Sequence, residues 1–267
     1  KFLLVGFFRS GTTLLSNSIN SHPKLHCVVD PMMIFLKLIR NKIFKYDYKR
    51  WDEDLENHIE LKEKNFKSRI KNINLKTSIS KKSINFVHVK LIHEKVYQHP
   101  NISKIKNFTG NRNFKNVFNY YLKEIKKLSK TKKKILGTKM SWCEEYLELF
   151  QKDNKNLKIV YIYRNIEDTI NSALNSKSYI DETPHAVRPI LYYIIYWKKS
   201  LLYVRKNKNI LMIKYEDLIK DFDFVINEVF GYLKVKKFKI KNFKDQYGNL
   251  WKNNSSFKKL TGSKTLV

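Results

Sequence analysis

The feature that most constrains the fold is a glycine loop between an apolar run and a helical pattern near the start of the chain. Residues 2–7, FLLVGF, form a short continuous apolar run, which is typical of a buried parallel strand. Gly6 and Gly11 stand five residues apart, and the helical pattern that begins at Thr12 is stopped by Pro23. A strand, a glycine loop and a helix in this order form the first half of a βα unit.

The rest of the chain repeats this alternation. Apolar runs at 134–141, 157–164 and 209–215 predict three more buried strands. The helical pattern after the last of them runs over 216–233, and a long amphipathic helix is expected over 183–207. Strands that alternate with helices indicate a parallel sheet with helices on both faces. The sequence therefore predicts an α/β chain with a P-loop NTPase-like three-layer fold.

The length fits one domain over residues 1–267, because single hydrophobic cores stop growing at roughly 250–300 residues. Residues from about 37 to 133 differ from the rest, being rich in Lys and Asn with scattered aromatic residues and several helical patterns. We interpret this segment as a helical insertion over one end of the sheet. Insertions on a fixed scaffold carry specificity, so we expect it to contribute to substrate choice.

The charge is the most unusual feature of the composition. Lys and Arg number 54 against 24 Asp and Glu, a formal net charge of +30. Such a field favours anionic partners, which include nucleotides, polyanions, sulfated sugars, membrane surfaces and nucleic acids, without choosing among them. A compositional bias toward Lys is the alternative explanation, since the chain has only eight Arg. The sequence leaves both explanations open.

Cysteine content and hydropathy bear on the compartment. Cys27 and Cys143 are too few for a disulfide framework and lie in no cluster with zinc spacing, so we expect a reducing, cytoplasmic location. A single bridge between the two remains open. The longest strongly apolar run, 190–197, is far shorter than the roughly 20 residues that span a bilayer, so no transmembrane segment is expected. An anchor or leader upstream of the sequence also remains open.

The loop departs from a nucleotide-hydrolysing P-loop at one position. The pattern GxxxxGK[ST] places a lysine after the second glycine, and this sequence has Thr12 there. The anion-binding backbone at the helix N-terminus is kept, but the reach toward a γ-phosphate is lost, so ordinary ATP or GTP hydrolysis is disfavoured. Arg9 instead places a cation inside the loop. The alternative is a glycine turn that binds nothing.

A second pair of residues indicates a phosphate site. In YRNIEDTINS, Arg164 ends a predicted strand and Ser172 lies two turns into the following helix. Both can face the carboxyl edge of the sheet, where α/β folds bind ligands, and a guanidinium with a hydroxyl makes a site for phosphate. The alternative is a capping Arg beside an exposed helical Ser.

Together the two motifs resemble sulfotransferases that use 3′-phosphoadenosine 5′-phosphosulfate (PAPS). In that family a [KR]SGTT loop holds the 5′-phosphosulfate, and RSGTT at 9–13 matches it. An Arg with a Ser eight residues later holds the 3′-phosphate, which Arg164 and Ser172 match. The loop Arg is similar to that of the tyrosylprotein and bacterial branch. Other similar segments are HP at 22–23, GTKMSW at 137–142, KYEDL at 214–218, FGYL at 230–233 and WKNNSSF at 251–257.

The resemblance implies roles for particular residues. Arg9 and Lys139 would stabilise the sulfuryl and leaving phosphate oxygens. Asp30 in CVVDP stands where the branch has a catalytic carboxylate, usually Glu, and is our first choice of base; His22 and His26 are the alternatives. The residues expected to hold the nucleotide, besides Arg9, Arg164 and Ser172, are Ser10, Gly11, Thr12, Thr13, Tyr215, Trp251, Lys252 and Asn253. Tyr215 and Trp251 also have an ordinary core interpretation, and no metal is expected.

The implied activity is transfer of a sulfuryl group from PAPS to an acceptor hydroxyl of a carbohydrate, lipid, small molecule or protein Tyr. The basic surface favours an anionic or carbohydrate acceptor. Two alternatives remain. A nucleotide kinase would need a lysine at position 12 and a strand-terminal Asp for Mg²⁺, whereas the strand at 157–164 ends in Arg. A basic nucleic-acid-binding protein is disfavoured, because the Lys-rich segments have no RNP motif, zinc knuckle or recognisable helix-turn-helix.

Overall fold

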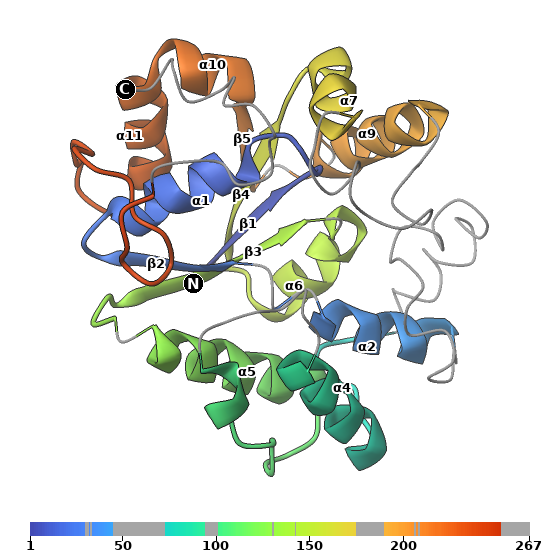
Figure 1. Cartoon of the computed structure of the whole chain (residues 1–267). Helices are drawn as coiled ribbons and strands as arrows, with labels where there is room; N and C mark the ends of the chain where they lie inside the picture. The colour runs from blue at the N-terminus through green and yellow to red at the C-terminus, as the bar shows by residue number, and fades with distance from the viewer. Residues whose placement is uncertain are drawn as a thin grey trace.

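A parallel β-sheet forms the centre of the molecule (Figure 1). The computed structural model describes residues 1–29, 32, 34–44, 73–93, 101–129, 131–141, 143–174, 190–205, 207 and 209–251. Within them five strands pair in the order β2-β3-β1-β4-β5, and every neighbouring pair is parallel. The strands are β1 (Phe2–Gly6), β2 (Leu25–Val29), β3 (Ile135–Ser141), β4 (Lys158–Tyr163) and β5 (Ile210–Lys214). The predicted α/β class with a P-loop-like parallel sheet is confirmed.

Helices cover both faces of the sheet (Figure 1). On one face lie α1 (Thr12–Ser21), α10 (Tyr215–Lys220) and α11 (Phe222–Tyr232). On the other lie α2 (Ile34–Phe44), α4 (Lys81–His93), α5 (Phe114–Leu128), α6 (Leu147–Asp153) and α9 (Ile190–Arg205), with short 3-10 turns at Ile102–Lys104 and Glu144–Tyr146. The remaining described helix, α7 (Ile166–Leu174), packs with α9 around Phe7. This is the predicted three-layer arrangement.

The central strand shows why its sequence is apolar without alternation. Phe2 and Leu4 of β1 join the core beneath α1, whereas Leu3 and Val5 join the larger core on the opposite face. All five residues of the strand are buried. A strand that is covered on both faces needs apolar residues at every position, and this is the pattern from which it was predicted.

Two expectations about the elements are corrected. β2 was not predicted, because it is a short edge strand in which polar His26 interrupts the apolar run. Its free edge is covered by buried Asn20 of α1, whose Oδ1 accepts from Cys27 N at 2.8 Å and whose Nδ2 donates to Cys27 O at 2.9 Å. The helix expected over 216–233 is two helices, α10 and α11, which break at Asp221.

The described helices of the segment 37–133 belong to the main core. Val87 of α4 and Val117, Tyr121 and Ile125 of α5 are buried in the same cluster as Leu3 of the central strand. These helices therefore share the core on one face of the sheet, because the strongly amphipathic α5 has an apolar side that needs a partner. That the segment is an insertion over one end of the sheet stays a prediction.

The two cysteines form no disulfide and are buried on opposite faces of the sheet, Cys27 beneath α1 and Cys143 in the larger core. This arrangement excludes the bridge that the sequence left open. Among the helices that the structure describes, none is both long enough and apolar enough to cross a membrane.

A buried carboxyl beneath the sheet makes the stability depend on pH. Burial raises the pKa of Glu144 above its ordinary value of 4.5. Ser200 Oγ donates to Glu144 Oε1 at 2.7 Å, and Tyr161 OH donates in turn to Ser200 Oγ. Because the folded chain holds this proton more tightly than the unfolded chain, the contribution of Glu144 to stability falls as the pH rises above 4.5.

We therefore expect Glu144→Gln to gain stability relative to the wild type as the pH is raised from 4.5 to 8. Glutamine cannot titrate, so the difference in Tm should move in favour of the variant by roughly 2–4 °C for about 1 kcal/mol. Thermal unfolding of both proteins across this pH range measures the difference. A difference in Tm that does not change with pH would contradict the prediction.

Candidate active site

The loop between β1 and α1 adopts a conformation that fixes its residues. Ser10 N donates to Phe7 O at 3.2 Å, and Arg9 and Gly11 have positive φ angles of 63° and 90°. A Cβ atom on Gly11 would lie 2.3 Å from Cδ2 of Tyr215, so the ring of Tyr215 packs directly on the glycine. The backbone angle and the close approach both require glycine at position 11.

The structure brings the two sequence motifs together. Arg9 Nε donates to Ser172 Oγ at 3.2 Å, although the two residues are 163 positions apart. The pKa of Arg9 is lowered, first by its burial and second by the positive charge of Arg164. Two guanidinium groups and a hydroxyl therefore converge at the carboxyl edge of the sheet. Such an arrangement is destabilised by repulsion between the cations and would be stabilised by an anion.

Arg164 follows β4 directly and lies against α10. Its guanidinium carbon is 4.6 Å from the centroid of the Tyr215 ring, and its Nε is 4.0 Å from Asp168 Oδ2 of α7. Tyr215 thus contacts both Gly11 and Arg164. The ring therefore links the two motifs. Packing in the core alone would not require contact with both of them.

The donors around the loop fit a phosphate group. The Ser10 hydroxyl is fully buried and has no hydrogen-bond partner among the described residues. Nor does any described side chain cap the N-terminus of α1, where Gly11, Thr12 and Thr13 begin the helix. A helix N-terminus offers unpaired N–H groups and a positive dipole end. An anionic 5′ end of a nucleotide would satisfy both the hydroxyl and these N–H groups.

Lys139 lies in β3, between β1 and β2. Its Cα pairs with Leu4 on one side and Val29 on the other, and only 6% of the residue is exposed. Buried lysines are rare, so the burial of Lys139 is consistent with a functional amine. Val29, the last residue of β2, pairs with Lys139, and Asp30 follows Val29 in the sequence. Asp30 itself, like Lys252 and Asn253, lies outside the described residues.

The two histidines lie away from the loop. His22 ends α1, a helix of ten residues that spans about 15 Å from the loop. Its Nδ1 accepts from Lys24 N at 3.1 Å and its Nε2 donates to Lys236 O at 3.2 Å. These contacts agree with a structural role for His22, and its role as an alternative base stays a prediction. His26 is buried within β2, three residues before the carboxyl end of that strand.

Trp251 packs against the core. Its backbone N–H donates to Phe243 O at 2.9 Å, and the centroids of the two rings lie 6.0 Å apart in an edge-to-face arrangement. This contact agrees with the core interpretation, and a role at the adenine stays a prediction. The segment that carries Trp251 is tied to the end of β2, because Gln246 Oε1 accepts from Val29 N at 2.9 Å.

Two residues near Arg164 were missed at the sequence level. Trp197 of α9 donates from Nε1 to Arg164 O at 2.8 Å, and Glu216 of α10 accepts from Asn165 N at 2.8 Å. Glu216 belongs to the segment KYEDL at 214–218, which at the sequence level was only a point of resemblance. Trp197 ends an apolar run that indicates burial alone. Nothing in either pattern points to the backbone groups that they contact.

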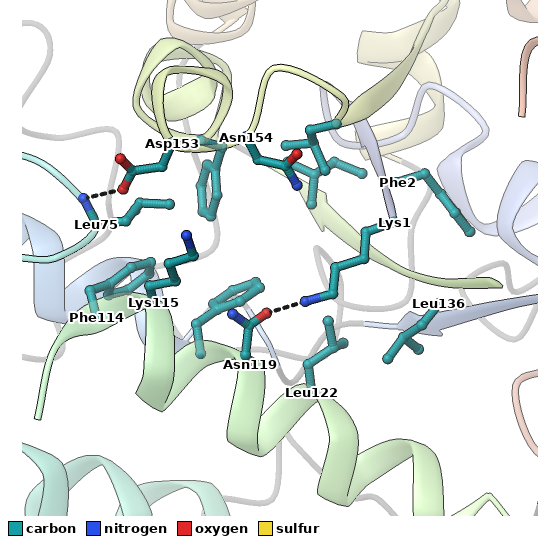
Figure 2. A pocket seen from close by; sticks show the side chains of 14 residues that line it. Lys1, Phe2, Leu75, Phe114, Lys115, Asn119, Leu122, Leu136, Asp153 and Asn154 are labelled. Carbon is teal, nitrogen blue, oxygen red and sulfur yellow. Dashed lines mark hydrogen bonds between the residues drawn. The ribbon is translucent and has the colours of Figure 1, made fainter. Parts of the chain in front are cut away.

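A small cavity lies at the opposite edge of the sheet (Figure 2). It has a volume of about 80 Å³ and is lined mainly by apolar side chains, among them Phe2, Phe114 and Leu157. At its rim Lys1 Nζ donates to Asn119 Oδ1 at 2.6 Å. Because β1 and β4 begin there, this cavity is remote from the carboxyl edge, where the guanidinium groups converge.

Comparison with known proteins gives one family. Residues 1–265 match the family model described as the sulfotransferase domain. Similar solved structures include the sulfotransferase domain of the olefin synthase of Synechococcus PCC 7002, with 14% identity, coverage of 92% of this chain and 78% of that chain, and a TM-score of 0.49. Mouse sulfotransferase SULT7A1, complexed with PAP, has 17% identity, coverage of 88% and 59%, and a TM-score of 0.41. No curated protein sequence matches the chain.

Proposed function

The chain belongs to the sulfotransferase family and is an enzyme of that type, and from this premise we propose which of its residues hold the donor PAPS. The observation that carries the proposal is the hydrogen bond from Arg9 Nε to Ser172 Oγ at 3.2 Å. It joins a loop suited to the 5′ end of the nucleotide with a pair suited to the 3′-phosphate. A nucleotide with both anionic groups satisfies both halves of the site at once.

We assign the 5′-phosphosulfate to the loop. The buried hydroxyl of Ser10 and the backbone N–H groups at Gly11, Thr12 and Thr13 would bind its oxygens. Arg9 places its charge beside them, in a setting where burial and Arg164 already lower its pKa. An anion there offsets the repulsion between the two guanidinium groups, which supports binding of a strongly charged ligand.

We assign the 3′-phosphate to Arg164 and Ser172. The Tyr215 ring supports the guanidinium of Arg164, which limits its freedom before a ligand binds. The role of Tyr215 at the adenine is proposed as well, since its ring lies between the loop and Arg164. We also propose that the segment with Trp251, Lys252 and Asn253 closes over the nucleotide. This part of the proposal rests only on the resemblance of WKNNSSF at 251–257 to the family.

The proposed chemistry uses positioning and charge. PAPS supplies an activated sulfuryl group, and transfer needs an acceptor oxygen in line with it. Arg9 and buried Lys139 would stabilise the charge that develops on the sulfuryl and phosphate oxygens. Asp30, which follows Val29 in the sequence, is the proposed base that takes the proton of the acceptor hydroxyl.

We propose an anionic carbohydrate as the preferred acceptor, because the net charge of +30 attracts polyanions and speeds their capture. The test is transfer of label from ³⁵S-PAPS to an acidic polysaccharide, a neutral glycan, a Tyr peptide and a long-chain alcohol. We expect the acidic polysaccharide to be labelled fastest at low salt, with a rate that falls as salt is added. Faster labelling of an uncharged acceptor would overturn this choice, and no labelling of any hydroxyl would count against sulfuryl transfer itself.

A further inference from the structure

One peptide group beside the proposed 3′-phosphate site is held from both sides by side chains. The carbonyl oxygen of Arg164 and the N–H of Asn165 belong to the same peptide group. Trp197 Nε1 donates to the oxygen at 2.8 Å, and Glu216 Oε1 accepts from the N–H at 2.8 Å. Each bond is at the short end of the normal range for N–H···O hydrogen bonds. The orientation of this peptide plane is therefore fixed at the point where β4 ends.

The two side chains come from opposite sides of the molecule. Trp197 lies on α9, which packs with α7 and the larger core, whereas Glu216 lies on α10, on the face of the sheet that α1 covers. Figure 1 shows α10 and α9 on either side of the end of β4. The peptide is thus held between two helices that lie on opposite faces of the sheet.

The same turn of α10 also holds the other end of Arg164. Tyr215 precedes Glu216 and contacts the Arg164 guanidinium at 4.6 Å, while Glu216 holds the following backbone N–H. The position of a long side chain depends on the direction of its Cα–Cβ bond, which the adjoining peptide plane sets. A small rotation of that plane displaces a guanidinium by an ångström or more, enough to weaken a two-point contact with a phosphate.

We propose that Trp197 and Glu216 are positioning residues that aim Arg164 at the 3′-phosphate of the nucleotide. The proposal rests on the assignment of Arg164 to that phosphate under the proposed function. It predicts that loss of either contact weakens ligands with a 3′-phosphate and leaves ligands without one unchanged. A residue that served only the stability of the fold would weaken both kinds of ligand equally.

The test is calorimetric titration with adenosine 3′,5′-bisphosphate and with adenosine 5′-monophosphate, which lacks the 3′-phosphate. The ratio of the two Kd values measures the preference for the 3′-phosphate. We expect this preference to fall about tenfold in Glu216→Ala and in Trp197→Phe, which keeps an aromatic ring but removes the donor. Thermal unfolding of each variant verifies that it is folded.

Two further variants separate the hydrogen bond from charge. Glu216→Gln should keep the preference for the 3′-phosphate, because the amide oxygen of glutamine can replace Oε1 as the acceptor from Asn165 N. The other carboxylate oxygen, Oε2, has no hydrogen-bond partner among the described residues that the change would remove. Asp217→Ala is the control for charge, because exposed Asp217 lies in the same first turn and the substitution removes the same charge from the helix N-terminus. This variant should keep the wild-type preference. A loss of preference in Asp217→Ala as large as in Glu216→Ala would overturn the proposal.

Arg164→Ala distinguishes this inference from the assignment on which it rests. If Arg164→Ala keeps the wild-type preference, the assignment of the 3′-phosphate is wrong. If Arg164→Ala loses the preference while both Glu216→Ala and Trp197→Phe keep it, the assignment stands and the positioning role is overturned. In the Arg164→Ala background, Glu216→Ala should cause no further loss, because the contact acts through Arg164. Should Glu216→Ala fail to fold, Trp197→Phe gives the same readout.

Discussion

Replacing Arg9 with alanine is expected to lower kcat for sulfuryl transfer by about 10³-fold. The loop places the guanidinium of Arg9 beside the proposed site of the 5′-phosphosulfate, and it bonds Ser172 at 3.2 Å. An arginine that stabilises the charge of a transferring phosphoryl group contributes roughly 10³–10⁵ to kcat, and sulfuryl transfer places a similar demand on the protein. Because Arg9 is already partly buried, it is partly desolvated before the ligand binds, which strengthens its effect.

Steady-state kinetics with labelled PAPS measures the effect, with two companion variants. Arg9→Lys should recover part of the loss, since it returns the charge without the planar fork that bonds Ser172. Arg205→Ala is the matched control, because Arg205 is exposed at the end of α9 and its removal changes the net charge by the same amount. A fall in kcat after Arg9→Ala no larger than after Arg205→Ala would contradict a role at the reacting group.

Gly11→Ala is expected to weaken binding of adenosine 3′,5′-bisphosphate by roughly 10- to 100-fold. Alanine at the Gly11 φ angle of 90° is strained, and such strain costs on the order of 1–3 kcal/mol. The new Cβ would also lie 2.3 Å from the Tyr215 ring, which must then shift and carry Arg164 with it. Both halves of the proposed nucleotide site are disturbed by one methyl group.

A second glycine gives the control for this substitution. Gly231 lies inside α11, and a Cβ there would meet no atom within 4 Å, so Gly231→Ala should leave binding unchanged and stabilise the helix slightly. Tyr215→Ala in the Gly11→Ala background removes the collision and leaves the backbone strain. Calorimetric titration of the three variants measures each Kd. Wild-type affinity in Gly11→Ala would show that the loop does not hold the nucleotide.

The sequence predicts those parts of the site that lie in short local patterns. The strand, loop and first helix follow from residues 2–23, because apolar periodicity and glycine spacing are set locally. The rule that ligands bind at the carboxyl edge of a parallel sheet placed Arg164 and Ser172 there, and the hydrogen bond from Arg9 to Ser172 agrees with it.

The remaining features depend on contacts that no local pattern encodes. The apolar pattern of edge strand β2 is too short to predict the strand by itself. The strand is held by hydrogen bonds between the Asn20 side chain of α1 and the backbone of Cys27. Trp197 and Glu216 act on the backbone of Arg164 and Asn165 from distant helices. A Trp or a Glu at these positions of a sequence does not indicate which backbone group its side chain binds.

His22 shows why residue type alone does not assign a base. His titrates near neutral pH, which made His22 an alternative to Asp30, but residue type carries no information about position. The structure places it at the far end of α1, where its ring packs against Phe230 at 4.6 Å and both nitrogens are hydrogen-bonded. The pKa of His22 is lowered, mainly because the ring is removed from water, and this agrees with a neutral structural ring.

The central claim is that the loop and the Arg164 pair hold a nucleotide with a 3′-phosphate and no need for a γ-phosphate. The most direct test is the thermal shift caused by adenosine 3′,5′-bisphosphate, by ATP with Mg²⁺ and by duplex DNA, each on the wild type and on Arg164→Ala. We predict the largest rise in Tm with adenosine 3′,5′-bisphosphate, lost in Arg164→Ala. A larger rise with ATP and Mg²⁺ would contradict the account and favour a nucleotide kinase.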